Sequence, residues 1–222
     1  MNVCYRIAWY GFRFIFRFYF RMRVYDAHQV PASGPVILAA NHASFLDPPL
    51  VGAGLDRDIH YLARESLFRF PVFRTVLYYW NVVPVDRDGG GAAGLKAIIR
   101  RLLGGGGVVM FPEGTRTRDG QLQPARSGLG LVVLKSAAPV IPVRLFGTFE
   151  AYGRHHWIPR PKPVAIKYGP PVDFSRLREE ARHCSKERLK EMYQEITDKV
   201  MAAIGALEAR PGARESGGLN KS

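Results

Sequence analysis

Short apolar runs, separated by glycine- and proline-rich breaks, divide the middle of the chain into candidate buried strands. Their length and apolar character are typical of strands covered on both faces. These runs are Val36 to Ala40, His60 to Ala63, Val82 to Val85, Val108 to Phe111, Val140 to Leu145 and Val164 to Tyr168. Three segments are predicted as helices, mainly from apolar residues at helical spacing: Ala92 to Leu103, Leu129 to Lys135 and Ser185 to Leu207. The alternation predicts an α/β domain with a central, mostly parallel sheet flanked by helices.

The N-terminal segment has a different pattern, in which aromatic and apolar residues are interspersed with arginines from Val3 to Val24. The pattern is amphipathic both as a strand and as a helix. As a helix, it places Arg6, Arg13, Arg17 and Arg21 on one stripe. We expect a helix because the segment is long for a strand, with Gly11 as a point where it could bend.

This N-terminal segment is a poor candidate for a membrane-spanning helix. Each arginine near the bilayer centre costs about 2.5–3.5 kcal/mol. A helix lying in the headgroup plane suits both residue types, since rings enter the acyl boundary and guanidinium groups bind phosphates. We therefore expect residues 1–28 to form a membrane-interface segment that binds anionic lipid through residues 3–24. The alternative is a helix packed on the protein's own core. A signal peptide is not indicated, because arginines interrupt its apolar region.

Composition narrows the class of protein and of partner. A chain of 222 residues, of which 47% are hydrophobic, suits one globular domain, which we place at residues 29–208. Residues 209–222 have the composition of a disordered tail. The net charge of +13 indicates a polyanionic partner, namely nucleic acid, an anionic membrane surface or a phosphorylated substrate. No usual nucleic-acid-binding motif is present. The two cysteines make neither a disulfide framework nor a zinc site.

A histidine and an aspartate follow directly on the first predicted strand, in the sequence Asn41-His42-Ala-Ser-Phe-Leu-Asp47. The end of a strand is where α/β folds place reactive groups. At this spacing the carboxylate could hold one ring nitrogen of His42, leaving the other to accept a proton. A helix cap and a core histidine are the structural alternatives. No Gly-x-Ser-x-Gly nucleophile elbow is present, so a nucleophile would come from the substrate.

A second polar cluster, Phe111-Pro-Glu-Gly-Thr-Arg116, follows another predicted strand. Gly114 would let a ligand approach the backbone, and Arg116 could bind a phosphate through two hydrogen bonds. Arg87 follows a third predicted strand, in Val85-Asp-Arg87. Each motif alone would indicate a turn with a surface charge. Together, three strand ends with these residues predict one convergent site.

In this order and spacing, N-H-x-S-x-x-D, V-D-R, F-P-E-G-T-R and V-I-P-V closely resemble the four sequence blocks of the glycerolipid acyltransferase family. The resemblance covers roughly residues 30–175. It implies a sheet of about seven strands, preceded by an amphipathic membrane-docking helical element. It also implies transfer of a fatty acyl group from acyl-CoA or acyl carrier protein to the free hydroxyl of 1-acylglycerol 3-phosphate, which forms phosphatidate. No cofactor is implied, and the expected place is the cytoplasmic face of the plasma membrane.

The resemblance assigns roles to individual residues. His42 would be the general base and Asp47 would orient it. The residues implied in substrate binding are Arg64, Arg87, Glu113, Gly114, Thr115 and Arg116. The fourth block, Val140 to Val143, belongs either to the acyl site or to the core. Arg64 stands where the family usually has lysine, which leaves the exact acceptor open.

Other functions stay open from the sequence. The same chemistry could act on glycerol 3-phosphate, another lysophospholipid or a lyso-aminolipid. A basic, non-catalytic membrane-binding protein would have no need of His42 or Asp47. A serine-type lipid hydrolase is disfavoured by the missing nucleophile elbow. The pair His155-His156 has no cysteine or carboxylate at ligand spacing, and we expect it at the surface.

Overall fold

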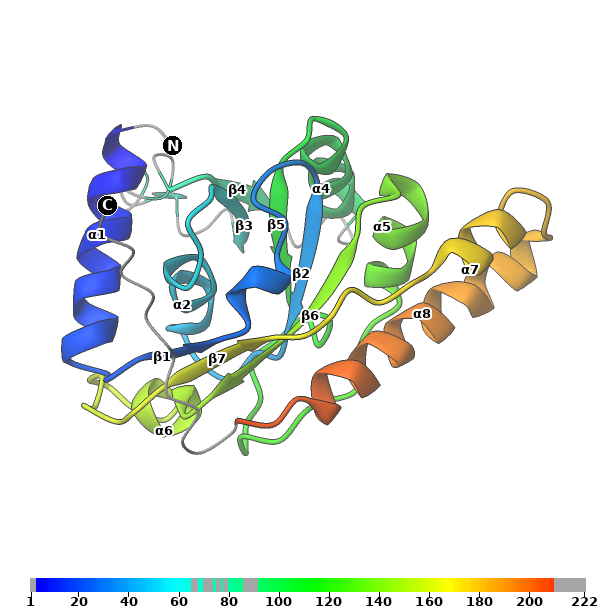
Figure 1. The fold of residues 1–222 in the computed structure, drawn as a ribbon. Helices are drawn as coiled ribbons and strands as arrows, with labels where there is room; N and C mark the ends of the chain where they lie inside the picture. Colours follow the sequence, from blue (N-terminus) through cyan, green and yellow to red (C-terminus); the bar gives the residue numbers. More distant parts are fainter. Residues whose placement is uncertain are drawn as a thin grey trace.

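The strands of the structure form one twisted sheet (Figure 1). The computed structural model describes residues 3–64, 68–69, 74, 77, 80–85 and 92–209. Within this part of the chain, seven strands are ordered β1-β7-β6-β2-β5-β3-β4. They are β1 (Arg23–Tyr25), β2 (Val36–Ala40), β3 (Ile59–Arg64), β4 (Val82–Val85), β5 (Gly107–Met110), β6 (Val140–Phe146) and β7 (Ala165–Tyr168). Neighbouring strands are parallel except β6 and β7, which are antiparallel.

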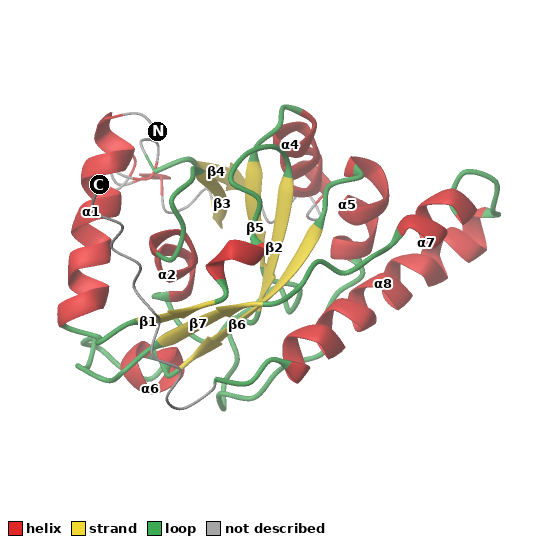
Figure 2. Cartoon of the chain, in the orientation of Figure 1, coloured by secondary structure: helices red, strands yellow, loops and turns green. Residues whose placement is uncertain are grey.

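Helices cover both faces of the sheet (Figures 1 and 2). The helices are α1 (Val3–Phe18), α2 (Asp47–Ala53), α4 (Ala92–Leu103), α5 (Gly128–Ser136), α6 (Thr148–Tyr152), α7 (Ser175–Glu180) and α8 (Lys186–Ala206), with a 3-10 turn at Ala27–Gln29. Buried side chains of α1 and α2 belong to the core on one face. Those of α4, α5, α7 and α8 belong to the core on the other. The result is a three-layer α/β domain.

The central strand β2 explains why the sequence pattern is continuously apolar there. Successive side chains of a strand point to opposite faces of the sheet. Accordingly, Val36, Leu38 and Ala40 belong to the core beneath α1 and α2, and Ile37 and Ala39 to the core beneath α4, α5 and α8. A strand covered on both faces has no polar side, so its sequence shows no alternation.

The predicted fold class is confirmed. Each of the six predicted strands and three predicted helices is present, with ends that differ by a residue or two. Helix α8 begins after Ser185, whose side-chain oxygen accepts a hydrogen bond from the Arg188 backbone N–H at 3.2 Å. The sequence analysis missed the short elements β1, α2, α6 and α7.

The N-terminal helix is shorter than the expected span to Val24. A single helix, without a break at Gly11, ends at Phe18. Arg21, which we expected on its arginine stripe, adopts a left-handed backbone with φ 49°. The Met22 N–H donates to the Phe16 carbonyl at 2.8 Å, and the chain then enters β1 beside β7. Pairing at the edge of the sheet and burial of Met22 outweigh continuation of the helix.

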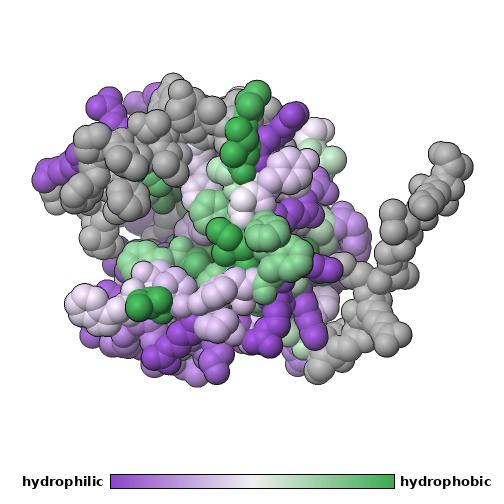
Figure 3. Space-filling view, turned by 90° about the vertical axis from the view of Figure 1, so that its left-hand side faces the viewer, coloured by the Kyte–Doolittle hydropathy of each residue, from purple (hydrophilic) through white to green (hydrophobic). Residues whose placement is uncertain are grey.

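Helix α1 is apolar on two sides. On one side Tyr5, Trp9 and Phe16 are buried, and the Trp9 Nε1–H donates to the carbonyl oxygens of Gly52 and Leu55 at 3.3 and 2.9 Å. The alternative of packing on the protein's own core therefore holds for this side. A second stripe is between 64% and 69% exposed: Val3, Ile7, Tyr10, Phe14 and Phe18. Figure 3 faces the α1 side of the molecule and shows apolar side chains gathered near its middle.

The search for membrane-crossing helices was negative for the described residues. None of the helices in this part of the chain combines the length and the hydropathy that a bilayer crossing requires.

Substitution of Gly130 tests the contact between α5 and α8. A Cβ at Gly130 would lie 2.1 Å from the Tyr193 carbonyl oxygen, which is backbone and cannot rotate away. We expect Gly130→Ala to lower the free energy of unfolding by about 1–3 kcal/mol, as overpacking does. Gly11 in α1 is the matched control, since a Cβ there meets nothing within 4 Å. Gly11→Ala is expected to be neutral or stabilising by up to about 1 kcal/mol. Chemical denaturation measures both; equal stabilities would contradict the close approach.

Candidate active site

His42 and Asp47 form a hydrogen-bonded pair at the end of β2. The His42 Nδ1 lies 2.9 Å from Asp47 Oδ2. The same Oδ2 accepts the backbone N–H groups of Ala43 at 2.6 Å and Ser44 at 2.7 Å. An oxygen that receives two N–H donors is acting as an acceptor, so the hydrogen lies on Nδ1 and the Nε2 lone pair is left to take a proton.

Local structure holds this pair in place. Asp47 is the first residue of α2, and its side chain is completely buried. Negative charge is favoured at the N-terminus of a helix. The imidazole stacks on the Phe111 ring at 4.0 Å between centroids and with an interplanar angle of 19°. The histidine side chain is 18% exposed, so the ring is supported on one face and can still be reached by a substrate.

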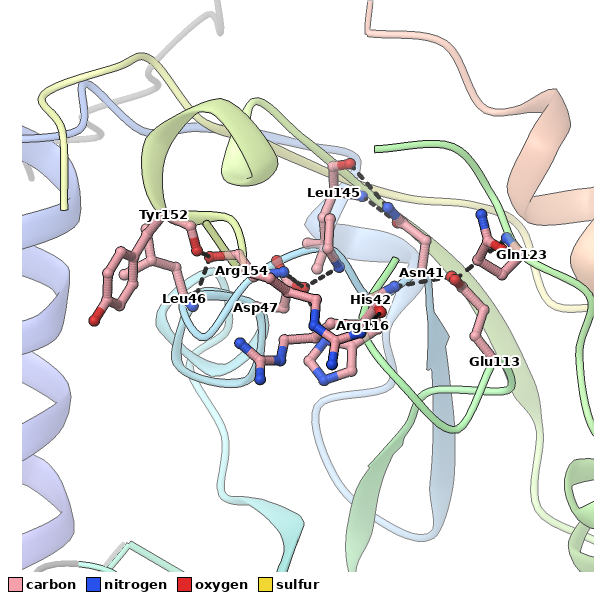
Figure 4. Close-up of polar contacts among 12 residues, drawn as sticks. Asn41, His42, Leu46, Asp47, Glu113, Arg116, Gln123, Leu145, Tyr152 and Arg154 are labelled. Atoms are coloured by element: carbon pink, nitrogen blue, oxygen red, sulfur yellow. Dashed lines mark hydrogen bonds and ion pairs between the residues drawn. The ribbon is translucent and has the colours of Figure 1, made fainter. Parts of the chain in front are cut away.

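Glu113 joins the loop after β5 to the histidine. Its Oε1 accepts the His42 backbone N–H at 2.9 Å, and its Oε2 accepts the Gln123 N–H at 3.3 Å (Figure 4). Burial raises the pKa of Glu113 to about 7, with a smaller contribution in the same direction from Asp47, while the two backbone donors oppose the shift. The carboxyl group is therefore close to half-ionised at neutral pH.

Arginines gather around a cavity of about 470 Å³ next to Glu113. Its basic lining residues are Arg116, Arg118, Arg126 and Arg154. The Arg116 guanidinium carbon lies 3.4 Å from the centre of the Phe45 ring, and Arg154 Nη1 donates to the Arg116 carbonyl at 3.3 Å. Figure 4 draws Arg116 and Arg154 together with His42 and Asp47. Such a cavity can bind a phosphate group by charge and by directed hydrogen bonds.

The structure places six of the eight predicted site residues, His42, Asp47, Glu113, Gly114, Thr115 and Arg116, in the two segments that follow β2 and β5. The loop after β5 carries Glu113, Gly114, Thr115 and Arg116, and Gly114 has the positive φ of 69° that favours glycine. Thr115 lines the arginine-rich cavity. The backbone of Arg64 ends β3, and its side chain is not described. Arg87 lies outside the described residues.

Several residues that support the site were not identified from the sequence. The Asn41 side chain binds the backbone of Leu145 through both its amide atoms, at 2.8 and 3.2 Å, and so ties β2 to β6. Ser44 Oγ donates to the Tyr152 carbonyl at 2.7 Å. Asn41 and Ser44 both lie within the Asn41–Asp47 motif, so their position in that motif could have indicated a role in the site. Gln123 and Arg154 lie outside all four blocks, and no signal indicated them.

The fourth block belongs to β6. Val140, Ile141 and Val143 are fully buried, and they pack on both faces of the sheet. This supports the core alternative for that block. Among the residues that the structure describes, no group of three or more histidine, cysteine, aspartate or glutamate side chains could hold a metal ion.

Comparison with known proteins agrees with the sequence motifs. The family model described as Acyltransferase matches residues 21–145. A 1-acyl-sn-glycerol-3-phosphate acyltransferase from Bacillus subtilis is 28% identical over 183 residues, which cover 81% of this chain and 86% of that protein. The protein of the same name from Cocos nucifera is 28% identical over 71% of this chain. The match spans only about half, 52%, of the coconut protein.

The fold is also found among solved structures. One example is the 1-acyl-sn-glycerophosphate acyltransferase from Thermotoga maritima, with a TM-score of 0.68 and 24% sequence identity. The superposition covers 93% of this chain and 83% of that chain. At this level of identity the likeness supports the α/β architecture described above.

The raised pKa of Glu113 predicts a pH dependence of stability. In the folded protein the group binds its proton up to about pH 7, whereas in the unfolded chain it releases it near 4.5. The unfolded state therefore gains stability as pH rises through this window, and the free energy of unfolding falls. Each pH unit removes at most about 1.4 kcal/mol.

Glu113→Gln cannot titrate and serves as the reference for this prediction. From pH 4.5 to 7, the window given by the Glu113 pKa, we expect the free energy of unfolding of the wild type to fall relative to that of the variant. Urea denaturation at several pH values measures it. A pH-independent difference would show that Glu113 has an ordinary pKa.

Proposed function

Because the chain belongs to the acyltransferase family, we propose that it transfers a fatty acyl group from a thioester to the free hydroxyl of 1-acylglycerol 3-phosphate. The donor would be acyl-CoA or acyl carrier protein, and the product phosphatidate. The observation that carries the proposal is the His42–Asp47 pair, held with Nε2 available and joined through Glu113 to the loop that lines the arginine-rich cavity. The names of the similar proteins from Bacillus subtilis and Cocos nucifera support the choice of acceptor.

His42 acts as the general base in the proposed reaction. Its Nε2 takes the proton of the acceptor hydroxyl while that oxygen attacks the thioester carbonyl carbon. A new carbon–oxygen bond forms, and the carbonyl oxygen becomes an oxyanion. When this intermediate collapses, the carbon–sulfur bond breaks and the thiol leaves with the proton returned by His42. Asp47 keeps the hydrogen on Nδ1 and stabilises the imidazolium form, as the carboxylate does in a serine hydrolase triad.

The arginine-lined cavity binds the phosphate of the acceptor. Arg116 contributes its guanidinium group, oriented by the Phe45 ring. Glu113 holds the His42 backbone, and because its pKa is about 7 it repels an anion less than a fully ionised carboxylate would. Arg64 and Arg87, taken from the sequence motifs, are proposed as further acceptor ligands.

We place the reaction at a membrane surface, with the protein bound peripherally. The exposed apolar stripe of α1 would enter the acyl boundary, and the arginines of residues 3–24 would contact anionic headgroups. The lipid acceptor and product would then stay in the bilayer next to the site. The proposed location is the cytoplasmic face of the plasma membrane, where acyl-CoA and acyl carrier protein would reach the site.

Removal of the proposed base tests the activity. We expect His42→Ala to lower kcat by about 10²–10⁴-fold, the usual contribution of general acid–base catalysis. The assay follows acceptor-dependent thiol release from acyl-CoA and from acyl carrier protein, with lysophosphatidate as acceptor. Asp47→Asn should lower kcat as well, because the wrong tautomer is favoured.

The control for this experiment is Arg182→Ala. Arg182 is an exposed residue just after α7, and its guanidinium lies 2.9 Å from the carboxylate of Glu179 in that helix. Thiol release that does not depend on an acceptor would indicate a hydrolase. Thiol release with another lysolipid, but not with lysophosphatidate, would assign that lysolipid as the acceptor. Full activity in His42→Ala would contradict the mechanism.

Substitution of Arg116 tests phosphate recognition. Arg116→Lys keeps the charge but loses the planar pair of donors and the stacking on Phe45. We expect KM for lysophosphatidate to rise about tenfold, which corresponds to the loss of roughly 1.4 kcal/mol, with a smaller change in KM for the acyl donor. Steady-state kinetics with each substrate varied separately measures this. Equal increases for both substrates would indicate a general distortion of the site.

A further inference from the structure

The segment between α6 and β7 exposes a tryptophan and an isoleucine that the proposed reaction does not use. Trp157 is 96% exposed and Ile158 is 74% exposed. Trp157 is the most exposed of the large hydrophobic residues in the described part of the chain. Large apolar side chains held in water at neighbouring positions are characteristic of interaction surfaces.

The residues around this pair are basic. The segment from 151 to 172 contains no aspartate or glutamate. It contains Arg154, Arg160 and Lys162 close to the exposed pair. Tryptophan flanked by arginine and lysine is a composition that favours the interface of a bilayer, where the ring lies at headgroup level and cations meet lipid phosphates.

Hydrogen bonds join this segment to the end of α1. The Tyr19 hydroxyl donates to the Pro159 carbonyl at 2.9 Å, and Arg21 Nη2 donates to the Pro161 carbonyl at 2.9 Å. Phe14 and Phe18, whose rings lie 4.6 Å apart, end the exposed stripe of α1 just before these contacts. The two apolar surfaces are therefore neighbours, and residues 3–25, like residues 151–172, contain no carboxylate side chain.

The same segment is also joined to the catalytic loops. The Tyr152 carbonyl accepts the Ser44 hydroxyl at 2.7 Å, and Arg154 donates to the Arg116 carbonyl. Ser44 lies within the His42–Asp47 motif, and Arg116 lies in the loop after β5. Residues 152–161 thus connect the active site at one end with the exposed stripe of α1 at the other.

We propose that residues 154–162 form a second membrane anchor, which inserts Trp157 and Ile158 into the interface of an anionic bilayer beside α1. Positive charge on both neighbouring surfaces fits anionic headgroups and disfavours a second copy of the same face. Because the anchor is bonded to the loops of Ser44 and Arg116, it sets the height of the active site above the headgroups. This inference goes beyond the proposed reaction, since it assigns a role to Trp157 and Ile158, which do not line the arginine-rich cavity.

Tryptophan fluorescence tests insertion directly. The wild-type protein is mixed with phosphatidylglycerol vesicles whose acyl chains carry bromine, which quenches tryptophan within the bilayer. Trp9 is buried against α2 and Trp80 is stacked on Phe12, so Trp157 is the exposed reporter. We expect quenching of the wild type to exceed that of Trp157→Phe clearly. Equal quenching of the two proteins while both are bound would place Trp157 in water and overturn the proposal.

Vesicle affinity gives a second test with a matched control. We expect Trp157→Ser with Ile158→Ser to weaken binding to phosphatidylglycerol vesicles by about tenfold or more, given the apolar area removed from the interface. Leu103→Ser is the control, because Leu103 is 69% exposed at the end of α4, on the opposite face of the sheet from α1. No loss, or a loss equal to that of the control, overturns the proposal. Neither measurement contains substrate, so failure of the proposed acyl transfer would leave both results interpretable.

Discussion

The geometry of the candidate active site depends on one buried oxygen atom. Asp47 Oδ2 accepts hydrogen bonds from the His42 ring and from the backbone of Ala43 and Ser44. The two backbone bonds bend the chain between β2 and α2 into a tight turn, and the ring bond fixes the imidazole on that turn. A shared acceptor thus couples the conformation of the loop to the tautomer of the histidine, so neither can change without loss of the other.

The sheet order brings the remaining groups to this turn. Strands β2 and β5 are parallel neighbours, so the loops at their carboxyl ends meet at one edge. There the Thr117 N–H donates to the His42 carbonyl at 2.8 Å, and Glu113 accepts the His42 N–H. Both backbone groups of the histidine are therefore bound by the loop that carries Arg116. The proposed base and the arginines proposed to bind phosphate therefore belong to one hydrogen-bonded unit, as a reaction between two positioned substrates would require.

Exposed apolar side chains are concentrated on α1 and on the segment after α6, a distribution that the α/β fold alone does not require. Helix α1 packs one apolar side on α2 and presents the other, and the segment after α6 adds a second exposed apolar surface joined to it. Both surfaces are flanked in the sequence by arginine or lysine residues, and neither residues 3–25 nor residues 151–172 contain an aspartate or glutamate. The proposed membrane binding would account for this distribution, because the contacts that hold the protein at the interface would also present the site to a lipid acceptor.

The sequence by itself determined the fold class and most strand positions, because buried parallel strands appear in it as uninterrupted apolar runs. It also determined the His42–Asp47 pair, because two residues only five positions apart at the end of a strand can reach each other whatever the rest of the fold. It did not determine where α1 ends, since Arg21 and Met22 continue a helical pattern until edge pairing with β7 decides otherwise. Nor did it identify Gln123, Arg154 or the Tyr19–Pro159 bond. These contacts join residues far apart in the chain or outside any motif, and only the packed tertiary structure brings their backbone donors and acceptors into reach.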